Sequence, residues 1–299
     1  MKSTIHEFQK NNLQGMSKNL KTIFALAFIA ILSSCSKDGD TTTPTPSPNP
    51  ADAVYRVKEY RDASNVAVIS YLYNAQNKMT KVVYAGGSFV NYTYNTAGLL
   101  ITEEYGGNIN SANNGVTSYV YDTTGAKIES VSTRNNGLSK GKFVYTNNSS
   151  GLPTGYKYFN WNAATSTWVA SPSNDGLYFY NTNNQEIRFQ RATDYTIYTY
   201  DDRGNQNSAR RYTIDAINGN YLSYQANSTY DDKKYNVIDP NYKQINNALT
   251  ANAKSLNQAG VASQEVSGNN TYEYNEAGYP TKQFTNGVLS VIYVLEKVQ

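Results

Sequence analysis

Residues 92–105 read YTYNTAGLLITEEY, and this stretch contains the pattern that predicts the fold. Tyr92 and Tyr94 are two residues apart, so their side chains lie on the same face of a β-strand. Asn95 and Gly98 then match a type I turn that closes with a left-handed residue, and an aliphatic segment follows. The stretch therefore predicts a β-hairpin.

The same unit recurs along the chain, with 20 to 44 residues between the first positions of successive copies. Seven copies begin with an aromatic residue, namely Tyr71, Tyr92, Tyr119, Phe143, Tyr178, Tyr198 and Tyr272, and a weaker copy begins at Ser228. The turn residues that favour a left-handed conformation are Asn77, Gly98, Gly125, Asn184, Gly204 and Gly278. A single hairpin is only marginally stable, so the hairpins must pair edge to edge. We expect an all-β antiparallel meander of repeated hairpins that forms one elongated or curled sheet.

One segment departs from the repeat. An N-cap residue followed by proline at 239–241 and a glycine at 260 mark the ends of a helix. Between them, aliphatic residues keep helical spacing at Ile245, Leu249, Ala253 and Leu256. We expect a helix over 240–259 that packs on the sheet, and a partner-binding helix is the alternative.

Residues 1–34 match a signal peptide, with Met16 as the expected start of translation. Lysines precede an apolar run at 22–32, which is too short to cross a bilayer but suits a signal segment. The sequence LSSC that ends at Cys35 resembles the bacterial lipobox, which implies that the Cys35 thiol carries lipid in the mature protein. A signal peptide with an incidental cysteine is the alternative. Cys35 is the only cysteine, so no intrachain disulfide can form.

The residues after Cys35 resemble the short export signal that sends lipoproteins of Bacteroidota to the cell surface. The matching residues are Ser36, Lys37, Asp38 and Asp40. Gly39 interrupts the acidic pair, so the periplasmic leaflet of the outer membrane remains the alternative location. The proline-rich residues 41–50 complete a tether over 35–50, because such sequences form extended spacers. The repeat domain then occupies 51–299.

The repeat itself resembles the YD repeats of RHS-like proteins and the tyrosine-rich repeat lipoproteins of Bacteroidota, many of which have no known function. The resemblance covers Tyr55 to Val298 and implies a curled or elongated β-sheet. The shells of RHS proteins need far more than eight repeats, so a toxin-enclosing shell is not expected.

Charge and residue types exclude several classes of function. Residues 51–299 hold 21 basic and 20 acidic side chains, because five and three of the totals of 26 and 23 lie before them. The net charge of +1 does not provide the basic surface that nucleic-acid binding requires. Cleavage at Cys35 would remove the only histidine, His6, and lipidation would block the only thiol. We therefore expect no cofactor, no metal site and no catalytic residue.

Three adjacent carboxylate pairs are candidate catalysts, namely Asp201 with Asp202, Asp231 with Asp232, and Glu103 with Glu104. Neighbouring residues on a strand point to opposite faces, so adjacency does not make a catalytic pair. A calcium loop at Asp201, Asp202 and Asn205 lacks EF-hand spacing. Capping of the turns is the expected role.

The best candidates for ligand binding are aromatic residues around the loop at 162–167. They are Tyr156, Tyr158, Phe159, Trp161 and Trp168. Flat aromatic faces can stack on sugar rings, but a cross-strand pair of tryptophans that stabilises the hairpin explains Trp161 and Trp168 equally well.

Three hypotheses for the function follow. The first is a non-catalytic, lipid-anchored protein of the outer membrane or cell surface whose repeat domain binds a glycan or a protein. The second is a structural accessory subunit of an outer-membrane transport or secretion complex. The third is a glycan-active enzyme that uses carboxylates.

Overall fold

The computed structural model describes residues 54–107, 114–134, 137–233 and 246–298, and these residues form an all-β structure of nineteen strands. The first nine strands are β1 (Val54–Arg61), β2 (Ala67–Tyr73), β3 (Met79–Tyr84), β4 (Phe89–Tyr94), β5 (Leu100–Gly106), β6 (Gly115–Tyr121), β7 (Lys127–Arg134), β8 (Ser139–Asn147) and β9 (Pro153–Asn162). The other ten are β10 (Thr167–Ala170), β11 (Gly176–Tyr180), β12 (Glu186–Arg191), β13 (Asp194–Tyr200), β14 (Gln206–Thr213), β15 (Tyr221–Tyr230), β16 (Ala248–Leu256), β17 (Ala262–Tyr274), β18 (Pro280–Thr285) and β19 (Val288–Val298).

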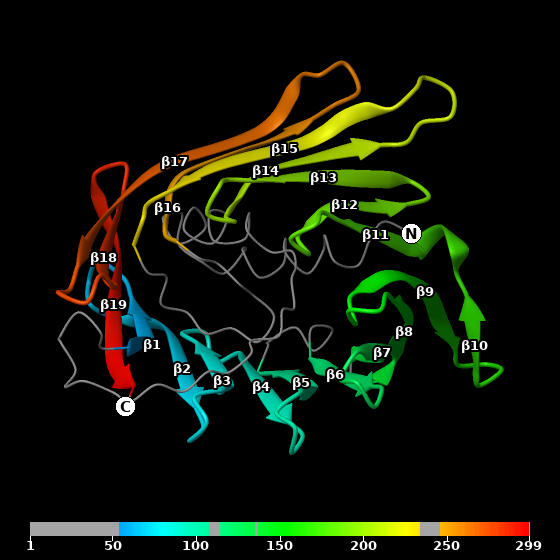
Figure 1. The fold of residues 1–299 in the computed structure, drawn as a ribbon, viewed down its shortest axis with the longest axis horizontal. Coiled ribbons are helices and arrows are strands. Elements are labelled where there is room, and N and C mark those ends of the chain that lie inside the picture. The colour runs from blue at the N-terminus through cyan, green and yellow to red at the C-terminus, as the bar shows by residue number, and fades with distance from the viewer. Residues whose placement is uncertain (1–53, 108–113, 135–136, 234–245, 299) are drawn as a thin grey trace.

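The sheet closes on itself (Figure 1). Strand β19 pairs antiparallel with β1, from Val54 opposite Val298 to Arg61 opposite Ile292. Among the described residues β10 pairs only with β9, so removing it from the nineteen leaves a closed barrel of eighteen strands. The predicted elongated or curled sheet is therefore wrong. Closure is favoured because pairing the first and last strands satisfies the backbone groups that both edges of an open sheet would expose.

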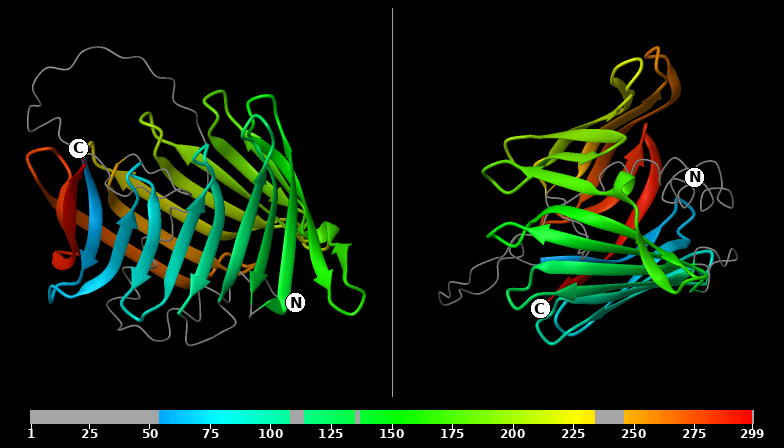
Figure 2. Two further views of the ribbon diagram at one scale, coloured as in Figure 1. Left: turned by 90° about the horizontal axis from the view of Figure 1, so that it is seen from below. Right: turned by 90° about the vertical axis from the view of Figure 1, so that its right-hand side faces the viewer.

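The strands lie side by side along the wall, and each runs antiparallel to its neighbours (Figure 2). Because the direction alternates, the turns that follow β2, β4, β6, β8, β11, β13, β15 and β17 all lie at one end of the barrel. We call this the turn end. It collects seven turns of the repeat and the described ends of the eighth, because residues 234–245 after β15 lie outside the described residues.

The turns have the predicted geometry. In the turn after β4, the Gly98 amide donates to the Asn95 carbonyl at 2.9 Å and the Leu99 amide donates to the Asn95 side chain at 2.9 Å. Gly98 has φ of 76°, and Asn77 and Asn184 have φ of 60° and 59° at the equivalent position. Matching side-chain caps occur at Asn74, Asp122, Asn148, Asn181, Asp201 and Asn275. The predicted hairpin turns are confirmed.

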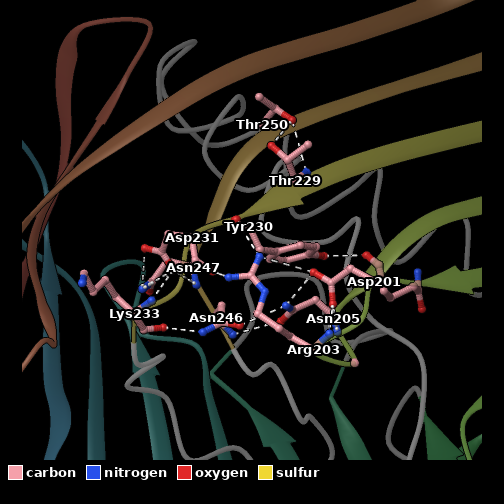
Figure 3. Close-up of polar contacts among 12 residues, drawn as sticks. Asp201, Arg203, Asn205, Thr229, Tyr230, Asp231, Lys233, Asn246, Asn247 and Thr250 are labelled. Carbon is pink, nitrogen blue, oxygen red and sulfur yellow. Dashed lines mark hydrogen bonds and ion pairs between the residues drawn. The ribbon is translucent and has the colours of Figure 1, made fainter.

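The two faces of the wall differ in burial. Side chains on the inside of a closed barrel converge, so the more buried of the two alternating sets is the inner one. Val57, Tyr71, Met79 and Val82 form one such buried cluster. Figure 3 shows the same alternation on β15, where the Tyr230 ring lies toward the barrel interior. The repeated tyrosines therefore line the inner face.

The tyrosines join each hairpin to the one before it. The Tyr94 hydroxyl on β4 donates to the Met79 carbonyl at 2.7 Å, and Met79 is the first residue of β3. The same bond to the first residue of a preceding strand is made from Tyr121 to Leu100, Tyr180 to Pro153, Tyr200 to Glu186, Tyr230 to Gln206 and Tyr272 to Ala248. The ring thus spans the junction between hairpins, and its hydroxyl ties that junction at the turn end.

The predicted helix over 240–259 is wrong where the structure describes it, because Ala248–Leu256 forms strand β16. Residues 240–245 lie outside the described residues. Strand β16 pairs with β15 on one side and with β17 on the other. Ala251 and Ala253 face inward and alternate with Asn252 and Lys254. Two flanking strands supply backbone partners for this segment, and such tertiary pairing outweighs a weak helical preference.

The predicted signal peptide at 1–34 and tether at 35–50 also lie outside the described residues, and so do Cys35, Ser36, Lys37, Asp38 and Asp40. Across the part of the chain that the structure describes, no helix has the length and hydropathy that a membrane span requires.

Removal of one tyrosine hydroxyl tests the bond between hairpins. We expect Tyr200→Phe to lower the free energy of unfolding by about 1 kcal/mol, because the Glu186 carbonyl loses its partner. Tyr221→Phe is the control, since the Tyr221 hydroxyl makes no hydrogen bond within the described residues. Urea unfolding of both variants measures the difference. Equal stability of the two variants would contradict the role given to the tyrosines.

Two glycines distinguish the effect of backbone conformation on stability from the effect of available space. A Cβ at Gly278 or at Gly86 would meet no atom within 4 Å, but only Gly278 has a positive φ, of 80°. We expect Gly278→Ala to lower stability by about 1–2 kcal/mol and Gly86→Ala to be neutral or slightly stabilising. Thermal unfolding of the pair checks this expectation, and an equal loss in both variants would show that the turn conformation is not limiting.

Candidate functional site

Among the described residues, the regular pairing of one hairpin with the next is interrupted between β9 and β11. The edge of β9 that would pair with the next hairpin is divided between two partners. Phe159–Asn162 pair with β10, whereas only Gly155 and Tyr156 pair with β11. The chain therefore adds a short extra hairpin, β9–β10, to the side of the wall. Both tryptophans of the protein, Trp161 and Trp168, lie on it.

The five aromatic residues predicted as a ligand site do not lie together. The pairing register places Tyr156 and Tyr158 on the inner face, opposite Tyr145 and Phe143. Tyr156 packs among aromatic rings of β8, β11 and β12. Burial raises the pKa of Tyr156 to about 12, against the opposing effect of Arg191. These two tyrosines belong to the packed inner face.

Phe159, Trp161 and Trp168 lie on the outer face and contact two lysines that the sequence did not single out. The Trp161 and Trp168 rings meet edge to face, with centroids 5.2 Å apart. Lys140 Nζ lies 5.0 Å from the Trp161 ring centroid, and Lys142 Nζ lies 5.1 Å from those of Phe159 and Trp168. We call these five residues the outer aromatic cluster. The predicted cross-strand pair of tryptophans is confirmed.

The lysines of the cluster could have been found from the sequence once the strand pairing was known. Lys140 and Lys142 are two residues apart on β8, and Lys142 lies directly opposite Phe159. A cation over an aromatic face is stabilised by the ring quadrupole, and the lysine stems also cover apolar surface. The pairing of β8 with β9 is what brings these side chains together.

The first member of each candidate aspartate pair caps a turn, as Figure 3 shows for Asp201 and Asp231. The Asp201 carboxylate accepts the backbone amides of Arg203 and Asn205 at 3.0 and 2.8 Å. Burial raises the pKa of Asp201, but hydrogen bonds from Asn205 outweigh this effect and leave the pKa below its usual value. Asp231 accepts the backbone amides of Lys233 and Asn247, both at 3.0 Å.

These two turns are also tied to each other. The Asn205 side-chain amide donates to the Asn246 side chain at 3.0 Å, and Arg203 donates to the Tyr230 carbonyl at 3.0 Å and to that of Asp231 (Figure 3). The adjacent Asp202 and Asp232 are exposed. Among the described residues, no three His, Cys, Asp or Glu side chains gather as a metal site. The predicted capping role is confirmed for Asp201 and Asp231.

Glu103 and Glu104 lie on opposite faces of β5, as the strand alternation predicted. Glu103 is buried on the inner face and accepts the Tyr105 hydroxyl at 2.5 Å. Glu104 lies on the outer face and accepts the Asn91 side-chain amide at 2.9 Å. Two carboxylates on opposite sides of a wall cannot act on one bond.

Comparison with known proteins gives likeness at the level of structures only. No family model and no curated protein matches the chain. A porin-like protein from Bacteroides uniformis is 13% identical with a TM-score of 0.39, and the match covers 80% of this chain and 98% of that chain. A porin-like protein from Bacteroides vulgatus is 11% identical with a TM-score of 0.37, and the match covers 81% and 98%.

The structure of TcdB2-TccC3-TEV is 10% identical with a TM-score of 0.33, and the match covers 80% of this chain. The chain spans only 16% of the length of that protein. At such identities and TM-scores, none of these likenesses carries an argument about the function of the chain.

Proposed function

We propose that the chain is a non-catalytic, lipid-anchored protein of the bacterial outer membrane that binds a glycan at the outer aromatic cluster. One observation carries this proposal. Both tryptophans lie on the β9–β10 hairpin, where the described part of the chain departs from the repeat, and their half-buried rings lie on the outer face beside two lysines. Aromatic residues at the surface with a polar rim are typical of binding surfaces. Strand β10 is not one of the eighteen strands that close the barrel.

The outer face of β14 to β17 supports attachment to the membrane through a lipid rather than through insertion of the barrel wall into the bilayer. One outer row across β14 to β17 consists of Arg210, Gln225, Lys254 and Glu265. The next row consists of Ser208, Asn227, Asn252 and Ser267. A barrel wall inside a bilayer carries an apolar band, and charged residues there are destabilising. These rows on β14 to β17 suit water, whereas Leu72, Val120 and Ile197 are exposed on other strands. The acylated Cys35 would hold the barrel at the membrane through residues 36–50.

The described carboxylates support a non-catalytic role. The first member of each candidate Asp pair holds a turn, and the two glutamates are separated by the wall. A glycan-binding surface needs none of them. An accessory subunit of a transport or secretion complex would use the same outer cluster for a protein partner, since tryptophan and lysine stems also suit such interfaces.

Binding to a glycan panel tests the proposal. The two variants are Trp161→Ala and Trp168→Ala, each made in a chain that begins at Ser36. This chain contains the complete barrel, because the barrel closes within Val54–Val298. We expect each to weaken binding by at least about tenfold, equivalent to about 1.4 kcal/mol, because the stacking face is lost. Val169→Ala is the control, since Val169 is exposed on the same hairpin. Unchanged binding by the tryptophan variants would overturn the assigned site.

Cell fractionation tests the location. We expect the wild-type protein to sediment with the outer membrane and to be removed by protease added to intact cells. Cys35→Ser should release the barrel into the soluble fraction, because the lipid attachment is lost. A periplasmic protein controls for lysis. Protection of the wild-type protein from protease would place the barrel on the periplasmic leaflet, and membrane retention of Cys35→Ser would contradict the lipid anchor.

A further inference from the structure

A depression of about 450 Å³ lies beside the outer aromatic cluster, at the seam between β9 and β11. Its walls include Thr146, Thr154, Lys157, Leu177 and Gln190. Gly155 and Gly176 also line it. Gly155 pairs with Leu177 and Gly176 pairs with Tyr156, and within the described residues these two pairs join β9 to β11. The depression therefore lies where the wall has its shortest pairing.

One glycine leaves the outer row of the wall without a side chain at this point. The row runs from Thr146 on β8 through Gly155 to Leu177 on β11. Thr146 and Leu177 therefore flank a position that carries no side chain, and the depression lies there. A Cβ on Gly155 would lie 2.9 Å from the Gly176 carbonyl oxygen, so the backbone itself keeps this position a glycine. Gly176 faces the inner side, where a Cβ would lie 2.4 Å from the Tyr156 ring.

The charges around the depression are balanced. Lys157 Nζ lies 2.9 Å from the Asp175 carboxylate, and an Arg191 guanidinium nitrogen lies 2.8 Å from the Asp194 carboxylate. Both cations of the lining are therefore engaged by an acid. A phosphate or carboxylate ligand would have to compete with these acids, so the lining favours a ligand without charge.

The remaining groups offer hydrogen bonds beside an apolar wall. Within the described residues the Gln190 amide has no hydrogen-bond partner, so its donor and acceptor are both available. Thr154 donates its hydroxyl to the Thr146 carbonyl at 3.1 Å, which leaves the Thr154 oxygen free to accept. Leu177 is 52% exposed and supplies apolar surface. A ring with hydroxyl groups on its edge and C–H groups on its face matches this combination.

The depression and the outer aromatic cluster form one continuous surface. Lys157, Phe159 and Trp161 alternate along the same face of β9. Gly155 and Trp161 are six residues apart on that strand, so at about 3.3 Å per residue the two ends of the surface are separated by about 20 Å. A ligand that reaches both ends must be an extended chain.

We propose that the depression is a second subsite, which takes a neutral sugar residue of a linear glycan whose other end stacks on the outer aromatic cluster. This inference rests on the proposed function, because it assigns the same ligand class to the adjoining surface. It adds that the ligand is a neutral oligosaccharide several residues long. Short fragments would occupy the aromatic end alone.

Dependence of affinity on chain length tests the second subsite. The probes are the disaccharide and the hexasaccharide of the cello-, malto-, manno- and xylo-oligosaccharide series, titrated calorimetrically into the chain from Ser36. We expect the hexasaccharide of one series to bind more tightly than its disaccharide. Gln190→Ala should weaken the hexasaccharide by roughly fivefold and leave the disaccharide unchanged, because only the longer ligand reaches the amide.

Two controls separate the possible failures. Gln225→Ala removes a glutamine from the outer face of β15, far from the seam, and should leave both affinities unchanged. Thr146→Trp fills the depression from an exposed strand position and should reduce the hexasaccharide to the affinity of the disaccharide. If Trp168→Ala abolishes binding but Gln190→Ala and Thr146→Trp do not change it, the second subsite is wrong and the proposed function stands. If the wild-type chain binds none of these sugars, the subsite is wrong, and binding to other members of the glycan panel decides the proposed function.

Discussion

The bond from a tyrosine hydroxyl to the first carbonyl of the preceding strand is the interaction on which the barrel depends. Each hairpin is held internally by its own turn, but neighbouring hairpins need a specific junction as well as the backbone ladder. Tyr94, Tyr121, Tyr200 and Tyr230 supply it at 2.7 to 2.8 Å, in the same place on four hairpins. Tyrosine suits this position because its ring fills the inner face and its hydroxyl still reaches a backbone acceptor.

The tyrosine hydrogen bonds between hairpins do not involve side chains of the outer face. The inner face carries the rings and the turn end carries the caps, so outer residues can vary without loss of the fold. On β14 to β17 they are mainly charged or polar, whereas the β9–β10 hairpin concentrates large aromatic residues and lysines. The contrast between the polar outer rows of β14 to β17 and the aromatic β9–β10 hairpin is the basis for placing the binding surface at that hairpin.

The hairpins could be predicted because their determinants are local. Asn95 and Gly98 define a turn within a few residues, and the positive φ of Asn77, Asn184 and Gly278 follows from the residue types. The helix prediction failed because the four-residue spacing of Leu249 and Ala253 also places both side chains on one face of a strand, and the pairing of β16 on both sides decided between helix and strand. The aromatic site was predicted in part. Trp161 and Trp168 do pair, but the register moves Tyr156 and Tyr158 to the other face.

The sequence by itself determined the β-hairpins, their turns and the faces on which the tyrosine pairs lie, because these depend on alternation and on residues a few positions apart. Only the tertiary structure decided that β1 meets β19, that Lys140 and Lys142 cover the rings of the β9–β10 hairpin, and that Gly155 lies between Thr146 and Leu177 where the depression forms. The physical reason is that barrel closure and cross-strand contacts depend on register between segments far apart in the chain, and no local pattern encodes that register.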